Sequence, residues 1–278
     1  MTARLEVQEL TVHFGRRPRP AISGVSFEIG PLERVGLIGE SGSGKSVTAL
    51  AIMGLLSDTA RVRGSVRWGG RELVGLADRQ YARLRGEQIS MIFQEPMTAL
   101  DPTMVAGRQV AEVLRLHEGA APGRARVRVL EMLQAVGIRD AQRVADSYPH
   151  QLSGGQRQRL LIAMALINTP DLLICDESTT ALDVTVQARV LGQLEAALTE
   201  AGAGMLFISH DLAVVSQICE RLLVMYRGRI VEEGPLNRIL NRPTHPYTRG
   251  LIATANLAAA RPGSRLPVLE DFWDGRQP

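Results

Sequence analysis

The chain has 278 residues, 45% of them hydrophobic, which is enough for one large domain with a substantial buried core. The formal net charge of +3 is small, so the composition gives little support to nucleic acid as a partner. Apolar stretches such as 47–56 and 160–167 are much shorter than the roughly 20 residues of a membrane-spanning helix, so we expect any membrane role to depend on partner proteins. The N-terminus lacks the basic start and apolar middle of a secretion signal, which predicts a cytosolic location.

Two kinds of strand pattern follow along the chain. Residues 5 to 36 alternate between polar and apolar, with a break at the proline-rich loop 18–20, which predicts an antiparallel start. Later strands are short continuous apolar runs, as expected of strands that are covered on both faces: 35–38, 172–175, 205–208 and 222–225. Cys175 lies in one of these runs, and neither it nor Cys219 belongs to a CxxC pair, so we expect both cysteines in the core.

Helical patterns separate the later strands. Apolar residues recur at helical spacing over 129–136, which Gly137 closes as a C-cap, and over 160–167. Between about residues 95 and 170 no strand pattern is found, and Pro102, Pro122 and Pro149 punctuate the helical stretches, so we expect a helical insertion in a mainly parallel α/β core. From about residue 241 the periodicity fades, which predicts a C-terminal extension over 241–278.

The strongest motif is GESGSGKS at residues 39–46, a complete GxxxxGK[ST] placed between the run 35–38 and the apolar helix that follows. Its glycines let backbone N–H groups curl around phosphate oxygens, and the helix dipole favours the negative charge. Lys45 can reach the β- and γ-phosphates, and the Ser46 hydroxyl can ligate magnesium. The alternative is a glycine-rich turn with a solvated lysine.

A carboxylate pair ends the second buried run. Asp176 stands where it can hold magnesium, directly or through water, and Glu177 can orient and polarise an attacking water. Alone, such a pair could equally be a solvated turn, and it gains its meaning from the motif at 39–46.

A second glycine-rich helix start, Leu152-Ser153-Gly154-Gly155-Gln156, opens the helix over 160–167. With this segment the chain resembles the ABC ATPase family, because GESGSGKS, LSGGQ and LLICDE stand in the family's order and spacing over residues 5 to 240. The resemblance implies an α/β fold: a P-loop NTPase (RecA-like) core with an N-terminal antiparallel β subdomain and a helical subdomain inserted at about 95–170. The ABC ATPase domain would then span 1–240.

The resemblance also assigns roles to single residues. Gln94 would contact magnesium or water and sense the γ-phosphate, Asp183 would lie in the D-loop between two ATPase subunits, and His210 would be the switch histidine. Asp183 could also be a helix N-cap, and the order Ser209-His210-Asp211 should not be taken for a hydrolase triad. Phe14 would stack on adenine, although an alternating strand would bury the same residue. The residues expected to bind ATP are Phe14, Gly39, Ser41, Gly42, Ser43, Gly44, Lys45, Ser46, Val47, Ser153, Gly154, Gly155, Gln156 and Asp183, and those expected to bind Mg²⁺ are Ser46, Gln94 and Asp176.

Four further segments resemble the importers for dipeptides, oligopeptides and nickel: 93–102, 148–150, 179–187 and 245–248. The resemblance implies a second ABC ATPase subunit, two transmembrane permease subunits and an extracytoplasmic solute-binding protein as partners, no nucleic acid, and a peripheral place on the cytoplasmic face of the inner membrane. The chain has Ser178 where the family usually has proline. Residues 249–278 contain no cysteine for an iron-sulfur cluster, which leaves peptide and nickel or metal-chelate uptake both open. A soluble ABC ATPase acting on DNA or ribosomes is the alternative of another class.

Overall fold

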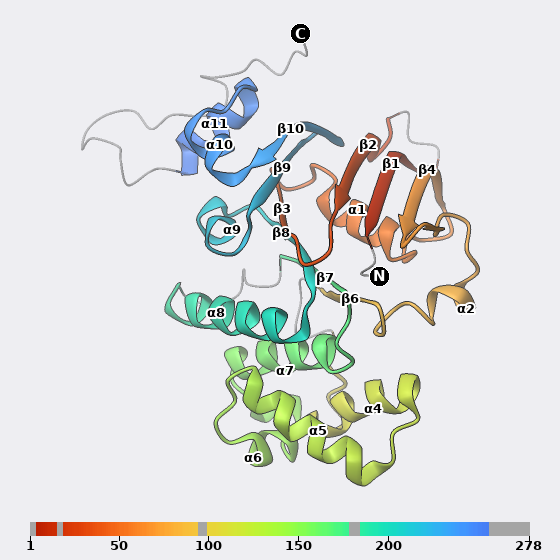
Figure 1. Ribbon diagram of the computed structural model, residues 1–278, viewed down its shortest axis with the longest axis vertical. Coiled ribbons are helices and arrows are strands. Elements are labelled where there is room, and N and C mark those ends of the chain that lie inside the picture. The colour runs from red at the N-terminus through yellow and green to blue at the C-terminus, as the bar shows by residue number, and fades with distance from the viewer. Residues whose placement is uncertain (1–3, 16–18, 94–98, 178–183, 256–278) are drawn as a thin grey trace. The chain divides into compact units, whose positions relative to one another are not determined.

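The computed structural model describes residues 4–15, 19–93, 99–177 and 184–255 (Figure 1). The chain forms two compact units. Unit 1 gathers Met1–Arg4, Gly30–Glu33 and Gly75–Leu206, and unit 2 gathers Leu5–Ile29, Arg34–Val74 and Phe207–Pro278. Strand β8 (Gly204–Ser209), all of whose residues are buried, runs from unit 1 into unit 2.

Unit 2 contains an antiparallel sheet with the strand order β2-β1-β4-β5. Its strands are β1 (Leu5–Phe14), β2 (Ile22–Ile29), β4 (Ala60–Trp68) and β5 (Arg71–Glu72). Leu5 pairs with Ile29 in antiparallel register, which confirms the antiparallel start expected from the sequence. A register shift after Val7 lets the apolar alternation resume at Leu10, because the two exposed residues between them have no partner in the pairing of β1 with β2.

The second group of strands in unit 2 carries helices at its ends. Strand β3 (Arg34–Ile38) runs parallel to β9 (Arg221–Tyr226), which pairs antiparallel with β10 (Arg229–Pro235). Helix α1 (Lys45–Ile52) follows β3 after the segment 39–44, and α9 (Leu212–Ile218), α10 (Leu236–Asn241) and α11 (Pro246–Ala255) complete the unit. Helix α1 thus begins two residues before the apolar run 47–56 and ends at Ile52, inside the run. The helix stops there because Gly54 takes a left-handed φ of 61°.

Unit 1 combines two parallel strands with most of the helices. Strand β6 (Ile89–Ile92) pairs parallel with β7 (Leu172–Asp176). The helices are α2 (Asp78–Tyr81), α4 (Ala106–Glu118), α5 (Pro122–Ala135), α6 (Ala141–Ala145), the 3₁₀ turn η1 (Pro149–Gln151), α7 (Gly154–Leu166) and α8 (Val184–Ala201). Within the described residues from 99 to 170 every regular element is helical. The expected boundaries of the helical subdomain and of the C-terminal extension remain predictions.

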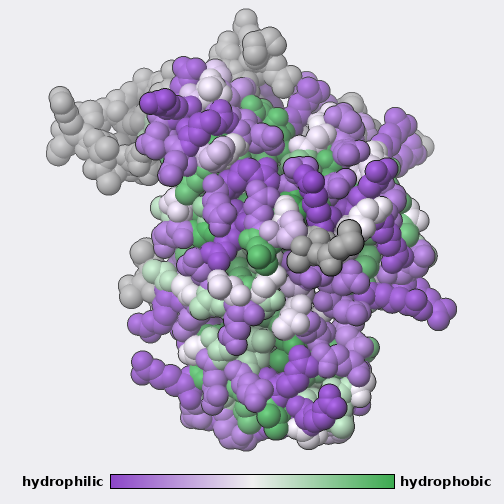
Figure 2. All heavy atoms as spheres, viewed as in Figure 1, coloured by the Kyte–Doolittle hydropathy of each residue, from purple (hydrophilic) through white to green (hydrophobic). Residues whose placement is uncertain are grey.

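Both cysteines are buried, as expected. The face of the molecule drawn in Figure 2 is largely hydrophilic with scattered apolar side chains. Among the described helices, none has the length and apolar character needed to span a bilayer.

Candidate functional site

The loop between β3 and α1 in unit 2 has a backbone that glycine alone can adopt at its tightest point. Gly44 has a φ of 111°, and a Cβ added there would lie 2.6 Å from the Cγ2 of Ile22 and 3.0 Å from the carbonyl oxygen of Ala21. Gly42 also lies in the left-handed region, with a φ of 77°. The glycines of the motif are therefore required by the fold of the loop itself.

Lys45 opens α1 and is 4% exposed. Its Nζ donates hydrogen bonds to the carbonyl oxygens of Gly39, at 2.8 Å, and of Glu40, at 2.9 Å. The first amides of a helix have no intrahelical acceptor, and at this helix start they belong to Lys45, Ser46 and Val47. One cation and several backbone donors are thus collected at the loop, which is the donor set that a polyphosphate needs.

Ser43 supplies an independent indication of a ligand. Its side chain is 4% exposed, and its Oγ has no hydrogen-bond partner among the described residues. A buried hydroxyl without a partner is costly in a folded protein, so such a group calls for an explanation. A phosphate oxygen in the loop would satisfy it, and the residues present therefore fit a bound nucleoside triphosphate.

Three contacts from the C-terminal part of unit 2 hold the loop in place. The amide of Gly228 donates to the carbonyl oxygen of Ser43 at 2.8 Å, and the amide of Glu40 donates to the hydroxyl of Tyr247 at 3.0 Å. Gly39 lies against β9, where an added Cβ would stand 2.2 Å from the carbonyl oxygen of Met225. The β9–β10 turn and helix α11 therefore fix the shape of the loop.

The carboxylate pair lies in unit 1, at the end of β7. Asp176 is the last residue of this fully buried strand and is 6% exposed. Glu177 follows in a left-handed conformation with a φ of 45°, which is uncommon outside glycine and is found at functional sites. The turn thus gives the two neighbouring carboxylates different backbone conformations.

The segment with Ser153 and Gln156 begins α7 through a capping box. Gln156 N donates to Ser153 Oγ at 3.3 Å, and Ser153 N donates to Gln156 Oε1 at 3.0 Å. The predicted helix start is confirmed. The amides of Gly154 and Gly155, the first two of the helix, have no acceptor within the helix, and the capping box satisfies only the third amide.

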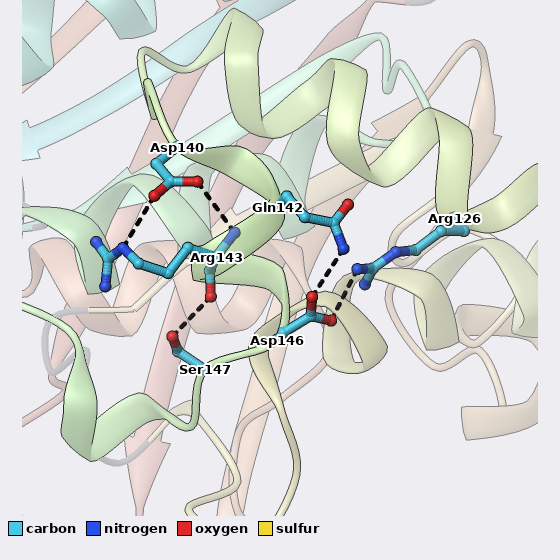
Figure 3. Close-up of polar contacts among 6 residues, drawn as sticks. All are labelled: Arg126, Asp140, Gln142, Arg143, Asp146 and Ser147. Atoms are coloured by element: carbon cyan, nitrogen blue, oxygen red, sulfur yellow. Dashed lines mark hydrogen bonds and ion pairs between the residues drawn. The ribbon is translucent and has the colours of Figure 1, made fainter.

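Polar contacts fix the helix that precedes this segment (Figure 3). Asp146 accepts from Arg126 and from Gln142, both at 2.7 Å, and Asp140 accepts from the amide of Arg143 at 3.2 Å. The Ser147 hydroxyl donates to the carbonyl oxygen of Arg143 at 2.7 Å. These bonds lie in unit 1 and anchor α6 before the turn that leads to α7.

Further predicted site residues lie in unit 2. His210 is exposed and follows β8 directly. Asp211 Oδ1 accepts from the amides of Ala213, at 2.9 Å, and Val214, at 3.4 Å, so this aspartate caps α9 and is not part of a hydrolase triad. Phe14 ends β1 and is half-buried, so the strand does not bury it fully.

Two predicted residues, Gln94 and Asp183, lie outside the described residues, as does Ser178. The sequence reasoning, in turn, gave no role to Tyr247 beyond the resemblance of its segment to the importers. Its hydroxyl accepts a hydrogen bond from the amide of Glu40 in the loop 39–46, which lies 207 positions away along the chain.

Comparison with known proteins places the chain among transport proteins. The family model described as ABC transporter matches residues 22–180. Over 269 residues the chain is 49% identical to the oligopeptide transport ATP-binding protein OppD of Mycobacterium tuberculosis, a match covering 96% of this chain and 44% of that protein. The chain therefore spans less than half the length of this relative.

Two other relatives are matched over most of their length. The chain is 46% identical to the probable peptide ABC transporter ATP-binding protein y4tR of Sinorhizobium fredii, over 95% of this chain and 80% of that protein. It is 45% identical to the oligopeptide transport ATP-binding protein AppD of Bacillus subtilis, over 91% of this chain and 79% of that protein. A solved dimeric ATP-binding cassette, in a post-hydrolysis state bound to ADP and Pi, superposes with a TM-score of 0.74 at 30% identity, covering 84% of this chain and 98% of that one. The chain belongs to the ABC transporter family.

Proposed function

We propose that this chain is the ATP-binding and ATP-hydrolysing subunit of an ABC importer that takes up di- and oligopeptides through partner permeases. The observation that carries the proposal is the loop at 39–46: Lys45 is nearly buried, the buried Ser43 hydroxyl has no hydrogen-bond partner among the described residues, and α1 begins directly after the loop. The names of the relatives, which are peptide transport ATP-binding proteins, support the choice of solute.

Binding of ATP draws on groups that the loop already collects. Lys45 exchanges its two carbonyl partners for the β- and γ-phosphates, and the amides of residues 44–47 donate to phosphate oxygens. The contact residues proposed here are Phe14 for the adenine ring and Gly39, Ser41, Gly42, Ser43, Gly44, Lys45, Ser46 and Val47 for the phosphates.

Hydrolysis uses the two carboxylates at the end of β7. Ser46, Gln94 and Asp176 would hold Mg²⁺, which neutralises charge on the phosphates when it is bound. Glu177 accepts a proton from the attacking water, and His210 supports the position of Glu177 and of the γ-phosphate. Asp176 and Glu177 are neighbours in the chain, so one turn serves both the metal and the water.

A complete site requires a second chain in this proposal. Ser153, Gly154, Gly155 and Gln156 form the start of α7, where the amides of Gly154 and Gly155 have no acceptor within the helix. These four residues would close over ATP held by the loop of a second ATPase subunit, with Asp183 along the interface. Two transmembrane permeases and an extracytoplasmic solute-binding protein complete the transporter, and this subunit would lie at the cytoplasmic face of the inner membrane.

A deletion strain tests the proposed solute. Growth on di- and oligopeptides as sole nitrogen source and the cellular nickel content are measured in the deletion strain and in a strain complemented with the wild-type gene. We expect a peptide-specific growth defect with normal nickel content. Normal peptide use with reduced nickel would favour a nickel or metal-chelate importer. A pull-down of the tagged chain from native membranes tests the transport role itself. Co-purification of ribosomes or DNA without a permease would contradict that role.

A further inference from the structure

The peptide group that joins Gly39 to Glu40 is held from both of its edges. The N–H of Glu40 donates to the Tyr247 hydroxyl oxygen at 3.0 Å, and the carbonyl oxygen of Gly39 accepts from Lys45 Nζ at 2.8 Å. In a trans peptide the N–H and the C=O point in opposite directions. Tyr247 therefore fixes the plane of the Gly39–Glu40 peptide, and the carbonyl on the opposite edge of that peptide binds Lys45.

Tyr247 is itself rigidly placed within unit 2. Its side chain is fully buried, and its ring packs on Tyr226 with a centroid distance of 4.4 Å. Its own amide donates to His245 Nδ1 at 3.2 Å. The buried carboxylate of Glu232 then accepts from the amides of Thr244, at 2.8 Å, and His245, at 2.9 Å, which ties the start of α11 to β10.

The Tyr247 hydroxyl accepts this hydrogen bond as a neutral phenol. Burial raises the pKa of Tyr247 to about 12, and the nearby Glu40 carboxylate acts in the same direction, although the hydrogen bond from the Glu40 amide lowers it. The phenol therefore stays neutral at physiological pH. A neutral oxygen of fixed position is a static support for the loop.

We propose that Tyr247 is a positioning residue for ATP binding: its hydroxyl holds the Gly39–Glu40 peptide in the orientation from which Lys45 transfers to the phosphates of ATP. The inference rests on the proposed nucleotide site at 39–46. Removal of the hydroxyl leaves the Glu40 amide without its partner. The peptide is then free to rotate, which turns the Gly39 carbonyl away from Lys45 and lowers the population of the loop that accepts ATP.

The test compares Tyr247→Phe with wild type in the same chain. The variant keeps the ring and its packing and loses one hydroxyl. We expect its Kd for ATP, measured by titration of a fluorescent ATP analogue, to rise about five- to tenfold. In the assembled ATPase the KM for ATP should rise by the same factor, while kcat at saturating ATP changes less than about twofold. Hydrogen exchange of the peptide covering residues 39–46 should accelerate.

Two further variants make the outcomes distinct. Tyr81→Phe applies the same change to a buried tyrosine of unit 1, and it should leave the Kd for ATP unchanged. Lys45→Ala should lose ATP binding if the proposed site is correct. Normal ATP binding by Lys45→Ala overturns the proposed site and this inference with it. If Lys45→Ala fails to bind ATP, two results overturn the inference about Tyr247 alone. The first is that Tyr247→Phe has the Kd for ATP and the hydrogen-exchange rate of wild type. The second is that Tyr247→Phe and Tyr81→Phe lose the same amount of ATP affinity and of melting temperature.

Discussion

Ser153 and Gln156 cap each other across the first turn of α7, with Gln156 N 3.3 Å from Ser153 Oγ and Ser153 N 3.0 Å from Gln156 Oε1. The residues that the proposal places over a partner's ATP are thus the same residues that begin the helix. A substitution here changes helix stability and, by our account, nucleotide turnover together. A matched cap elsewhere in unit 1 separates the two effects.

Ser153→Ala should therefore lose about 1 kcal/mol of the free energy of unfolding and lower ATP turnover of the assembled dimer at least ~10-fold. Asp140→Ala is the control, because Asp140 caps α6 through the amide of Arg143 in the same unit (Figure 3). The control should lose a similar unfolding free energy and keep its turnover. Phosphate release measures the turnover, and urea denaturation measures the free energy of unfolding. Equal turnover in the two variants would show that Ser153 is a helix cap only.

Glu177→Gln keeps the size of the side chain and loses the negative charge that polarises water. We expect ATP to bind normally while turnover falls at least ~10²-fold. The ATP-bound pair of subunits should then accumulate, which size-exclusion chromatography with and without ATP detects. Turnover within tenfold of wild type would remove Glu177 from the proposed catalytic role.

Glu232 should make the unit that carries the phosphate loop sensitive to acid. Burial alone raises the pKa of this carboxyl, but hydrogen bonds from the amides of Thr244 and His245 and from the Thr244 hydroxyl help to bring it below the usual 4.5. A group with a lowered folded-state pKa stabilises the fold above its unfolded-state pKa, and this contribution is lost as the pH falls through the folded-state value.

Glu232→Gln should accordingly cost about 1–3 kcal/mol of unfolding free energy at pH 7, and the difference from wild type should shrink as the pH falls below 4.5. Urea denaturation at a series of pH values measures this difference. The exposed neighbour Glu233 provides the control, since Glu233→Gln should change little at any pH. A Glu232→Gln deficit that stays constant down to strongly acidic pH would contradict the assignment.

Much of the strand framework could be predicted because burial on both faces leaves a continuous apolar run. Strands β3, β7, β8 and β9 all lie where such runs stand in the sequence. Strand β4 escaped prediction although Val62, Val66 and Trp68 alternate with polar residues, because Gly64, at a φ of 95°, interrupts the alternation. An added Cβ at Gly64 would lie 2.4 Å from the carbonyl oxygen of Glu9, so the reason for this glycine is the β1 bulge, which is distant in sequence.

The site divides in the same way. Local motifs predicted the phosphate loop and the helix start at Ser153, because each needs particular residues within a few positions. The contact between Glu40 and Tyr247 joins residues 207 positions apart and has no local pattern. The order Ser209-His210-Asp211 was expected not to be a hydrolase triad, and the Asp211 carboxylate indeed caps α9.

The most direct test of the account is ATP binding and hydrolysis by Lys45→Ala. Lys45 is nearly buried and supplies the cation that the loop offers to the phosphates, so its removal leaves no compensating charge there. Binding of a fluorescent ATP analogue and phosphate release are measured for wild type and variant, with circular dichroism to establish that both are folded. We predict that the folded variant loses ATP binding and therefore ATP hydrolysis. Near-normal turnover in Lys45→Ala would contradict the assignment of the nucleotide site to residues 39–46.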